Sequence, residues 1–148
     1  MELVIIIIGL LLDRITKFWA INSLKGNEGI VVIKNLFAFE YLENRGAAFG
    51  ILQNKLNFLA IITFIVLIGM IYYRLKYKPK TKIMKVSLAL IISGAIGNLI
   101  DRIWIKYVVD FILVHYKEVY YFPTFNVADI LVVVGTFLFA LCIIKEWE

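Results

Sequence analysis

The chain has very little cysteine, histidine and proline, and these shortages exclude several kinds of protein. Its 148 residues include one cysteine, Cys142, one histidine, His115, and two prolines. A single cysteine cannot form a disulfide within the chain, and Cys142 lies in an apolar run, where we expect it to pack as a small hydrophobic side chain. A zinc site or an H-E-x-x-H metallopeptidase needs more histidine or cysteine than this, so neither is expected.

Charged residues are also scarce, at 18%, whereas hydrophobic residues make up 62% and the mean hydropathy is +0.88. This is the composition of a membrane protein. The formal net charge is +5, but the excess is concentrated in one linker, about residues 74–85, and no nucleic-acid partner is expected. The basic residues of that linker are Arg74, Lys76, Lys78, Lys80, Lys82 and Lys85.

Four apolar segments are long enough to cross a bilayer, which predicts an all-α integral membrane protein with one membrane domain over residues 1–148. The segments cover about residues 3–21, 56–73, 83–105 and 126–144. The first follows no basic stretch and no small-residue cleavage site follows it, so we expect it to be retained as a helix. The basic linker between the second and third segments is expected in the cytoplasm. Both termini would then be cytoplasmic, and the two long connections would face outward.

The first outward connection contains three runs of β-forming residues, at Ile30–Ile33, Phe37–Leu42 and Ala47–Leu52. They predict a small β-sheet, at about residues 30–52, between the first and second helices on the outer surface. The second connection, about residues 106–124, is rich in aromatic residues typical of a membrane interface.

Two carboxylates lie among otherwise apolar residues near the outer ends of the last two segments. Asp110 follows the third segment, and Asp129, 19 positions later, opens the fourth. An ionised and a protonated carboxyl group, placed close together, can hydrolyse a peptide bond. The alternatives are that Asp129 merely caps its helix with Asn126 and that Asp110 is a solvated loop residue.

A polar stripe and an i, i+4 pair accompany these acids. Asn98, Asp101 and Arg102 share one face of the third segment, where they could hold a substrate or form an Asp101–Arg102 charge pair. Asp13 and Lys17 are placed to form an ion pair within the first segment, or to reach the same site. Gly94 and Gly97 favour close helix contact. Residues 44–50 could be a hairpin turn or a flap over the site.

Two other catalytic or transport schemes fit less well. A dyad of Ser93 and His115 would join residues at different membrane depths, and no G-x-S-x-G sequence surrounds the serine. A proton or cation transporter should carry its acids near midmembrane, whereas these acids lie toward one rim. A noncatalytic scaffold would have no use for the polar stripe.

The chain resembles lipoprotein signal peptidase, also called signal peptidase II, a family of bacterial aspartic endopeptidases. The matching sequences, in order, are Asp13-x-x-x-Lys17, Asn44-x-Gly46-Ala47-Ala48-Phe49-Gly50, Gly97-Asn98-x-x-Asp101-Arg102, Val109-Asp110-Phe111 and Phe125-Asn126-x-Ala128-Asp129. Each motif is weak alone, but five in this order are specific.

The resemblance implies that Asp110 and Asp129 are catalytic. It further implies that Asn44, Gly46, Asn98, Arg102 and Asn126 support the site or contact substrate, and that Asp13, Lys17 and Asp101 stabilise it. The implied substrate is a prolipoprotein carrying diacylglycerol on its cysteine, cleaved just before that cysteine. The implied setting is the bacterial cytoplasmic membrane and its lipids, with no metal or organic cofactor and with inhibition by globomycin-type cyclic peptides. We expect the active site near the outer face and the enzyme to be a monomer.

Overall fold

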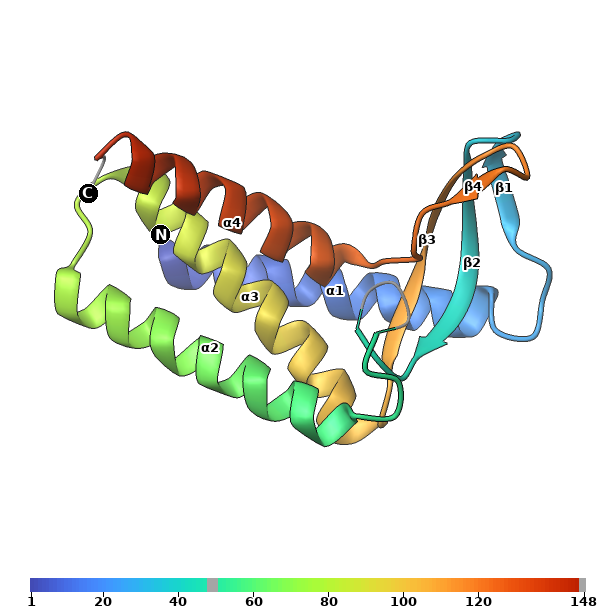
Figure 1. Cartoon of the computed structure of the whole chain (residues 1–148), viewed down its shortest axis with the longest axis horizontal. Helices are drawn as coiled ribbons and strands as arrows, with labels where there is room; N and C mark the ends of the chain where they lie inside the picture. Colours follow the sequence, from blue (N-terminus) through green and yellow to red (C-terminus); the bar gives the residue numbers. More distant parts are fainter. Residues whose placement is uncertain (48–50, 147–148) are drawn as a thin grey trace.

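The computed structural model describes residues 1–47 and 51–146, and it contains four long helices beside one small sheet. The helices are α1 (Glu2–Ser23), α2 (Leu56–Tyr77), α3 (Lys82–Trp104) and α4 (Val127–Ile144). The start of α1, the end of α4 and the α2–α3 linker lie together at the end of the molecule farthest from the sheet (Figure 1). The basic linker and the sheet therefore occupy opposite ends.

Helix α3 is the centre of the helical part, because α1, α2 and α4 all pack against it. Small residues allow this close packing. A methyl group added to Gly94 would lie 2.3 Å from the backbone oxygen of Ala128, and one added to Gly135 would lie 2.9 Å from Ser87 O. The prediction that Gly94 and Gly97 permit close contact is confirmed. Cys142 is fully buried with Met84 and Leu88, also as predicted.

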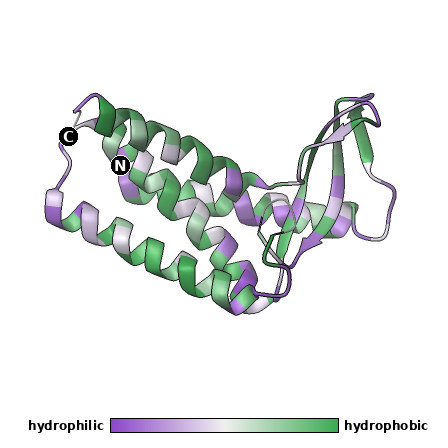
Figure 2. Cartoon of the chain, in the orientation of Figure 1, coloured by the Kyte–Doolittle hydropathy of each residue, from purple (hydrophilic) through white to green (hydrophobic). Residues whose placement is uncertain are grey.

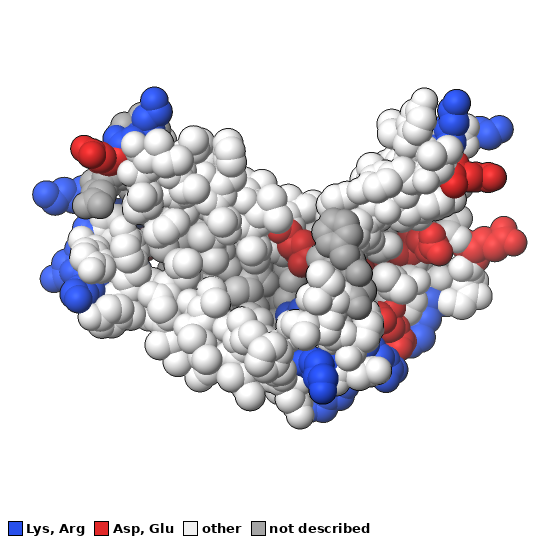
Figure 3. Space-filling model, viewed as in Figure 1, with Lys and Arg blue, Asp and Glu red and all other residues white. Residues whose placement is uncertain are grey.

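Three of the four helices, α2, α3 and α4, are long and apolar enough to cross a membrane. Helix α1 carries three charged residues in its middle, Asp13, Arg14 and Lys17, and its role as a fourth span stays a prediction. Asp13 and Lys17 face inward, whereas α1 exposes Leu3, Leu11 and Phe18. The helices form a largely apolar band (Figure 2), and the charged side chains visible in Figure 3 gather mainly toward the two ends.

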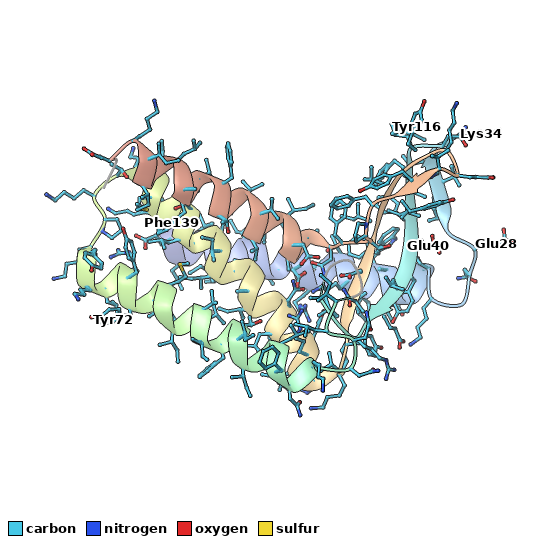
Figure 4. The ribbon with its side chains drawn as sticks, viewed as in Figure 1. Glu28, Lys34, Glu40, Tyr72, Tyr116 and Phe139 are labelled. Atoms are coloured by element: carbon cyan, nitrogen blue, oxygen red, sulfur yellow. The ribbon has the colours of Figure 1, made fainter. Side chains whose placement is uncertain are left out.

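The sheet is antiparallel, in the order β1-β2-β3-β4. Its strands are β1 (Ile30–Ile33), β2 (Phe37–Asn44), β3 (Val108–Tyr116) and β4 (Tyr120–Tyr121). Figure 4 shows Lys34 and Tyr116 at the tip of the sheet and Tyr72 at the opposite end of the molecule.

Two features of the sheet correct the sequence-based expectation. The sheet is not confined to the connection between α1 and α2, because β3 and β4 come from the second connection. The third expected strand, Ala47–Leu52, does not form in its described part. Ile51 and Leu52 lie in a turn, with Leu52 at a φ of 57°, a left-handed conformation that no strand contains. Residues 48–50 lie outside the described residues.

A small core attaches the sheet to the end of α1. Ala20 of α1 and Leu24, directly after α1, are buried with Val109 and Phe111 of β3. Trp19 adds edge-to-face ring contacts with Phe39 of β2 and Phe111. This packing fixes β3 relative to the helices. Asp110, between Val109 and Phe111 on β3, therefore has a defined position.

Candidate active site

The two candidate catalytic aspartates are brought together by β3 and the start of α4. Asp110 is 1% exposed in β3, and Asp129 is in the first turn of α4. Phe125, just before α4, pairs with Ile112 of β3, and the backbone N–H of Ile112 donates to Phe125 O at 2.8 Å. This pairing places the N-terminus of α4 beside the strand that carries Asp110.

Asn126 connects the two carboxylates directly. Its side-chain amide nitrogen lies 2.6 Å from Asp110 Oδ1, and its backbone nitrogen lies 3.1 Å from Asp129 Oδ2. The Asn126 side-chain oxygen accepts from the backbone N–H of Asp129 at 3.0 Å. The capping box predicted from Asn126 and Asp129 is therefore present. Because Asn126 also binds Asp110, capping and a role in the site do not exclude each other.

Two further asparagines complete the hydrogen bonds to the aspartates. Asn44, at the end of β2, donates to Asp110 Oδ2 at 2.9 Å, and its own oxygen accepts from the backbone N–H of Gly46 at 2.9 Å. Asn98 of α3 donates to Asp129 Oδ1 at 2.7 Å. The structure thus gathers Asn44, Gly46, Asn98, Asn126 and both aspartates in one place. The expectation that Asp110 might be a solvated loop residue is wrong, since it lies buried in a strand.

Burial sets the electrostatics of Asp110. Loss of solvent contact raises the pKa of Asp110 to about 7, and the nearby charge of Asp129 adds to this increase. Hydrogen bonds from Asn44 and Asn126 oppose it by stabilising the ionised form. Two acids that share a site and resist double ionisation can hold one proton between them near neutral pH.

A buried cluster of charges supports the site from α1. Lys17 contacts Asp13 at 3.0 Å and Asp101 at 2.8 Å. The predicted Asp13–Lys17 ion pair is therefore present. Arg14 contacts Asp13 at 2.5 Å and Asp101 at 2.7 Å, and it also donates to the backbone oxygen of Gly97. Two acids and two bases balance each other, which makes their burial tolerable.

The partners of Asp101 correct one alternative from the sequence, because Asp101 pairs with α1 rather than with Arg102. Arg14 was not singled out from the sequence as a site residue. The sequence did carry a signal for it: Arg14 is a third charged residue in an apolar segment, directly after Asp13, and charged residues in such segments are costly unless they are paired.

Arg102 takes a different position from the cluster. Its Nε atom is buried and has no hydrogen-bond partner among the described residues. Its side chain lines the same cavity as Asp110 and Asp129. Arg102 therefore holds one buried N–H donor without a partner, in a side chain that lines the cavity.

The cavity has a volume of about 610 Å³ and lies between α2, α3, α4 and the sheet. Its polar part contains Asn44, Asn98, Arg102, Asp110 and Asp129. The rest is mainly apolar and includes Ile62 and Val66 of α2, Ala95 of α3 and Val133 of α4. Figure 3 shows a hollow between the helical part and the raised sheet. This combination suits a substrate with one polar reacting group and a large apolar part.

The other sequence candidates lie apart from this cavity or outside the described residues. Ser93 donates to the backbone oxygen of Ile6 at 3.2 Å, and His115 contacts Lys117 O and stacks on Tyr121. These contacts give no serine–histidine dyad. Gly46 and Ala47 are described, but Ala48, Phe49 and Gly50 are not, so the proposed flap lies partly outside the described residues.

Comparison with known proteins gives consistent matches over nearly the whole chain. The family model described as signal peptidase (SPase) II matches residues 5–145. A lipoprotein signal peptidase of Clostridium novyi (strain NT) is 58% identical over 146 residues, covering 99% of both chains. The lipoprotein signal peptidase of Clostridium tetani (strain Massachusetts / E88) is also 58% identical, covering 99% of this chain and 94% of its own.

Solved structures agree with these sequence matches. One bacterial membrane enzyme, determined by the in meso method, is 34% identical with a TM-score of 0.89, covering 98% of this chain and 88% of its own. A second bacterial membrane enzyme is 33% identical with a TM-score of 0.85, covering 98% of this chain and 93% of its own.

Proposed function

The chain belongs to the signal peptidase II family, and on this premise we propose that it is an aspartic endopeptidase acting on lipid-modified prolipoproteins. Asp110 and Asp129 are its catalytic pair. It removes the signal peptide from a precursor whose cysteine carries diacylglycerol, cleaving just before that cysteine. It acts as a monomer in the bacterial cytoplasmic membrane.

The observation that carries this proposal is the connection of both carboxylates through Asn126 at one end of a largely apolar cavity. Asn126 binds Asp110 through its side chain and Asp129 through its backbone. Both carboxylates line the cavity. A transporter is less well supported, because Asp101, Asp110 and Asp129 lie where α3 and α4 meet the sheet, rather than along a path through the helices. Asp13, in the middle of α1, is joined to Asp101 through Arg14 and Lys17.

The chemistry follows from one shared proton. The ionised carboxylate removes a proton from a water molecule, whose oxygen bonds to the scissile carbonyl carbon. The protonated carboxyl group donates its proton to the carbonyl oxygen. In the second step the carboxyl group that took the water proton donates it to the leaving amine as the carbon–nitrogen bond breaks. The other carboxylate takes a hydroxyl proton from the diol, and the pair returns to its starting state.

The arrangement of the cavity fits a substrate that remains in the membrane. Side chains of α2 and α4 form its apolar walls, and the aspartates lie where the helices meet the sheet. With the basic linker and both termini in the cytoplasm, this end is at the outer membrane surface. A lipidated precursor can then reach the aspartates without moving its peptide into the hydrocarbon. The unpartnered Nε of Arg102, in a side chain that lines the cavity, supports a role in binding the peptide.

The direct test is cleavage of a diacylglyceryl prolipoprotein by the purified protein in lipid nanodiscs. The wild type should release the shortened lipoprotein, and Asp110→Asn and Asp129→Asn should each reduce cleavage by at least about 10³-fold. Glu40→Gln is the matched control, because Glu40 is an exposed acid on β2 (Figure 4). It should cleave at the wild-type rate.

Two outcomes would contradict the proposal. Cleavage by either folded aspartate variant would remove that residue from the mechanism. Equal cleavage of an unlipidated precursor would remove the requirement for lipid. A globomycin-type cyclic peptide should block the reaction in competition with substrate, and the active species should sediment as one chain.

A further inference from the structure

The ammonium group of Lys17 lies among three oxygens. Its nitrogen donates a hydrogen bond to Asn98 Oδ1 at 2.9 Å and forms ion pairs with Asp13 Oδ1 at 3.0 Å and Asp101 Oδ2 at 2.8 Å. An ammonium group has N–H donors and no acceptor. The side chain is 3% exposed. Lys17 is therefore held in one position, and only an oxygen can face it.

This contact determines which way the Asn98 amide points. Because Lys17 can only donate, the Asn98 oxygen must face it, and the Asn98 NH2 group must face the other way. That NH2 group donates to Asp129 Oδ1 at 2.7 Å. Asn126 strengthens the same orientation by donating to Asn98 Oδ1 at 3.2 Å. The polarity of Asn98 thus follows from a residue on α1 that does not contact either aspartate.

The other two asparagines have the same kind of constraint. The Asn126 oxygen accepts from the backbone N–H of Asp129, and the Asn44 oxygen accepts from the backbone N–H of Gly46. A backbone N–H group can only donate, so the oxygen of each amide must face it. The NH2 group of each amide therefore turns toward Asp110. All three amides consequently present N–H groups, and no oxygen, to the two aspartates. The charged side chain of Lys17 sets this polarity for Asn98, whereas backbone N–H groups set it for Asn44 and Asn126.

We propose that Lys17 is a positioning residue, which orients Asn98 as a donor to Asp129 and thereby keeps Asp129 ionised while Asp110 holds the proton of the pair. This rests on the proposed peptidase function. Asp129 also lies in the first turn of α4, where the helix dipole favours negative charge. Burial, which raises the pKa of Asp110 to about 7, is consistent with that residue holding the proton.

The charged groups on the neighbouring elements favour one ionised carboxylate in the pair. Lys17 on α1 and Arg102 on α3 are positive charges near both aspartates. Asp13 and Asp101 are neutralised by Arg14 and Lys17. Glu43 on β2 is paired with Lys25. Asp110 is the facing acid on β3.

The orientation has a consequence for the proton on Asp110. Both of its oxygens already accept an amide N–H, and the amides offer no oxygen in return, so its O–H needs another acceptor. The scissile carbonyl oxygen is that acceptor. Asp129 takes the proton of the attacking water, and Asp110 gives its proton to the carbonyl oxygen. When the carbon–nitrogen bond breaks, Asp129 protonates the amine and Asp110 regains a proton from the diol.

The experiment compares Lys17→Met, Asn98→Ala and the double variant in the same nanodisc assay. We expect Lys17→Met to lower kcat by about 10- to 100-fold with little change in KM, and to shift the acid side of the kcat/KM–pH profile to higher pH. If Lys17 acts through Asn98, the double variant should stay within about threefold of Asn98→Ala alone. If the wild type does not cleave the precursor, the proposed function fails. If the wild type cleaves it but the Lys17 and Asn98 variants do not behave as expected, only the role of Lys17 fails.

Controls distinguish positioning from simple stability. Ser93→Ala also removes an α3–α1 hydrogen bond, to Ile6, and should leave kcat and the pH profile unchanged. If Lys17→Met does not fold, Lys17→Gln provides the same comparison, because its neutral amide can turn either its oxygen or its NH2 group toward Asn98. Two results would overturn the proposal. One is a loss of kcat in the double variant equal to the product of the two single losses, and the other is a wild-type pH profile in a folded Lys17 variant.

Discussion

A methyl group on Gly97 would lie 2.6 Å from the Oδ2 atom of Asp13. That oxygen cannot move freely, because Arg14 binds it through two nitrogens. The close approach of α1 and α3 at Gly97 therefore holds Asp13 in the buried charge cluster that it forms with Arg14, Lys17 and Asp101.

Gly97→Ala should destabilise the protein and disturb this cluster. We expect a loss of about 1–3 kcal/mol in the free energy of unfolding, as for other overpacked positions, together with slower cleavage. Thermal unfolding in detergent measures the first effect. Gly69→Ala is the control, since nothing lies within 4 Å of a methyl group there and alanine favours a helix. Equal unfolding temperatures for the two variants would contradict the steric explanation.

Asn126→Asp should separate helix capping from the role of Asn126 in the site. The new carboxylate can still accept from the backbone N–H of Asp129, so α4 keeps its cap. It places an acceptor instead of an N–H donor against Asp110, which should lower cleavage by about 100-fold or more.

Thr81→Ala is the matched control for capping, because Thr81 accepts from Met84 N at the start of α3, at the opposite end of the molecule. It should lose about 1 kcal/mol of stability and retain full activity. An active Asn126→Asp variant would show that the donor to Asp110 is not needed.

The pH dependence of cleavage should reflect the pKa of Asp110, which burial and Asp129 raise to about 7. If Asp110 donates the proton, kcat/KM should fall as the pH rises through about 7, because the free enzyme then loses that proton. The measurement is a kcat/KM–pH profile with a lipidated precursor. A plateau extending well above that pH would exclude Asp110 as the acid.

The same shift has an effect on stability. The folded protein binds a proton at Asp110 between pH 3.8, the ordinary value, and about 7, whereas the unfolded chain does not. Stability should therefore decrease as the pH rises through this window. Thermal unfolding should be measured from about pH 4 to about pH 8, which spans this window. The unfolding temperature should depend less on pH for Asp110→Asn than for the wild type. Parallel curves would contradict the burial explanation.

Arg14→Met should destabilise the protein, because Lys17 alone would then face two acids, Asp13 and Asp101. Breaking a fully buried ion pair costs about 3–5 kcal/mol. Because the Arg14 side chain is 35% exposed, we expect a smaller loss, of about 2 kcal/mol. Adding Asp13→Asn restores the balance of charge, so the double variant should unfold at a higher temperature than Arg14→Met alone. A further decrease in the double variant would show that the individual contacts matter more than the balance.

Features that depend on neighbours along the chain could be predicted from the residues alone. A helix places residues three and four apart on one face, so the Asp13–Lys17 ion pair and the capping box of Asn126 and Asp129 could be read directly. Long apolar runs gave the positions of α2, α3 and α4, and motif order gave the family.

Contacts between residues far apart in the chain became known only from the fold. Asp101 pairs with Arg14, 87 positions away, rather than with its neighbour Arg102. Asp110 lies in a strand paired with β2, where Asn44, 66 positions away, binds it. Strand pairing and helix packing join segments with no common local pattern, so periodicity in the sequence cannot reveal them. For the same reason, the orientation of Asn98 became visible only when Lys17 of α1 was placed against it.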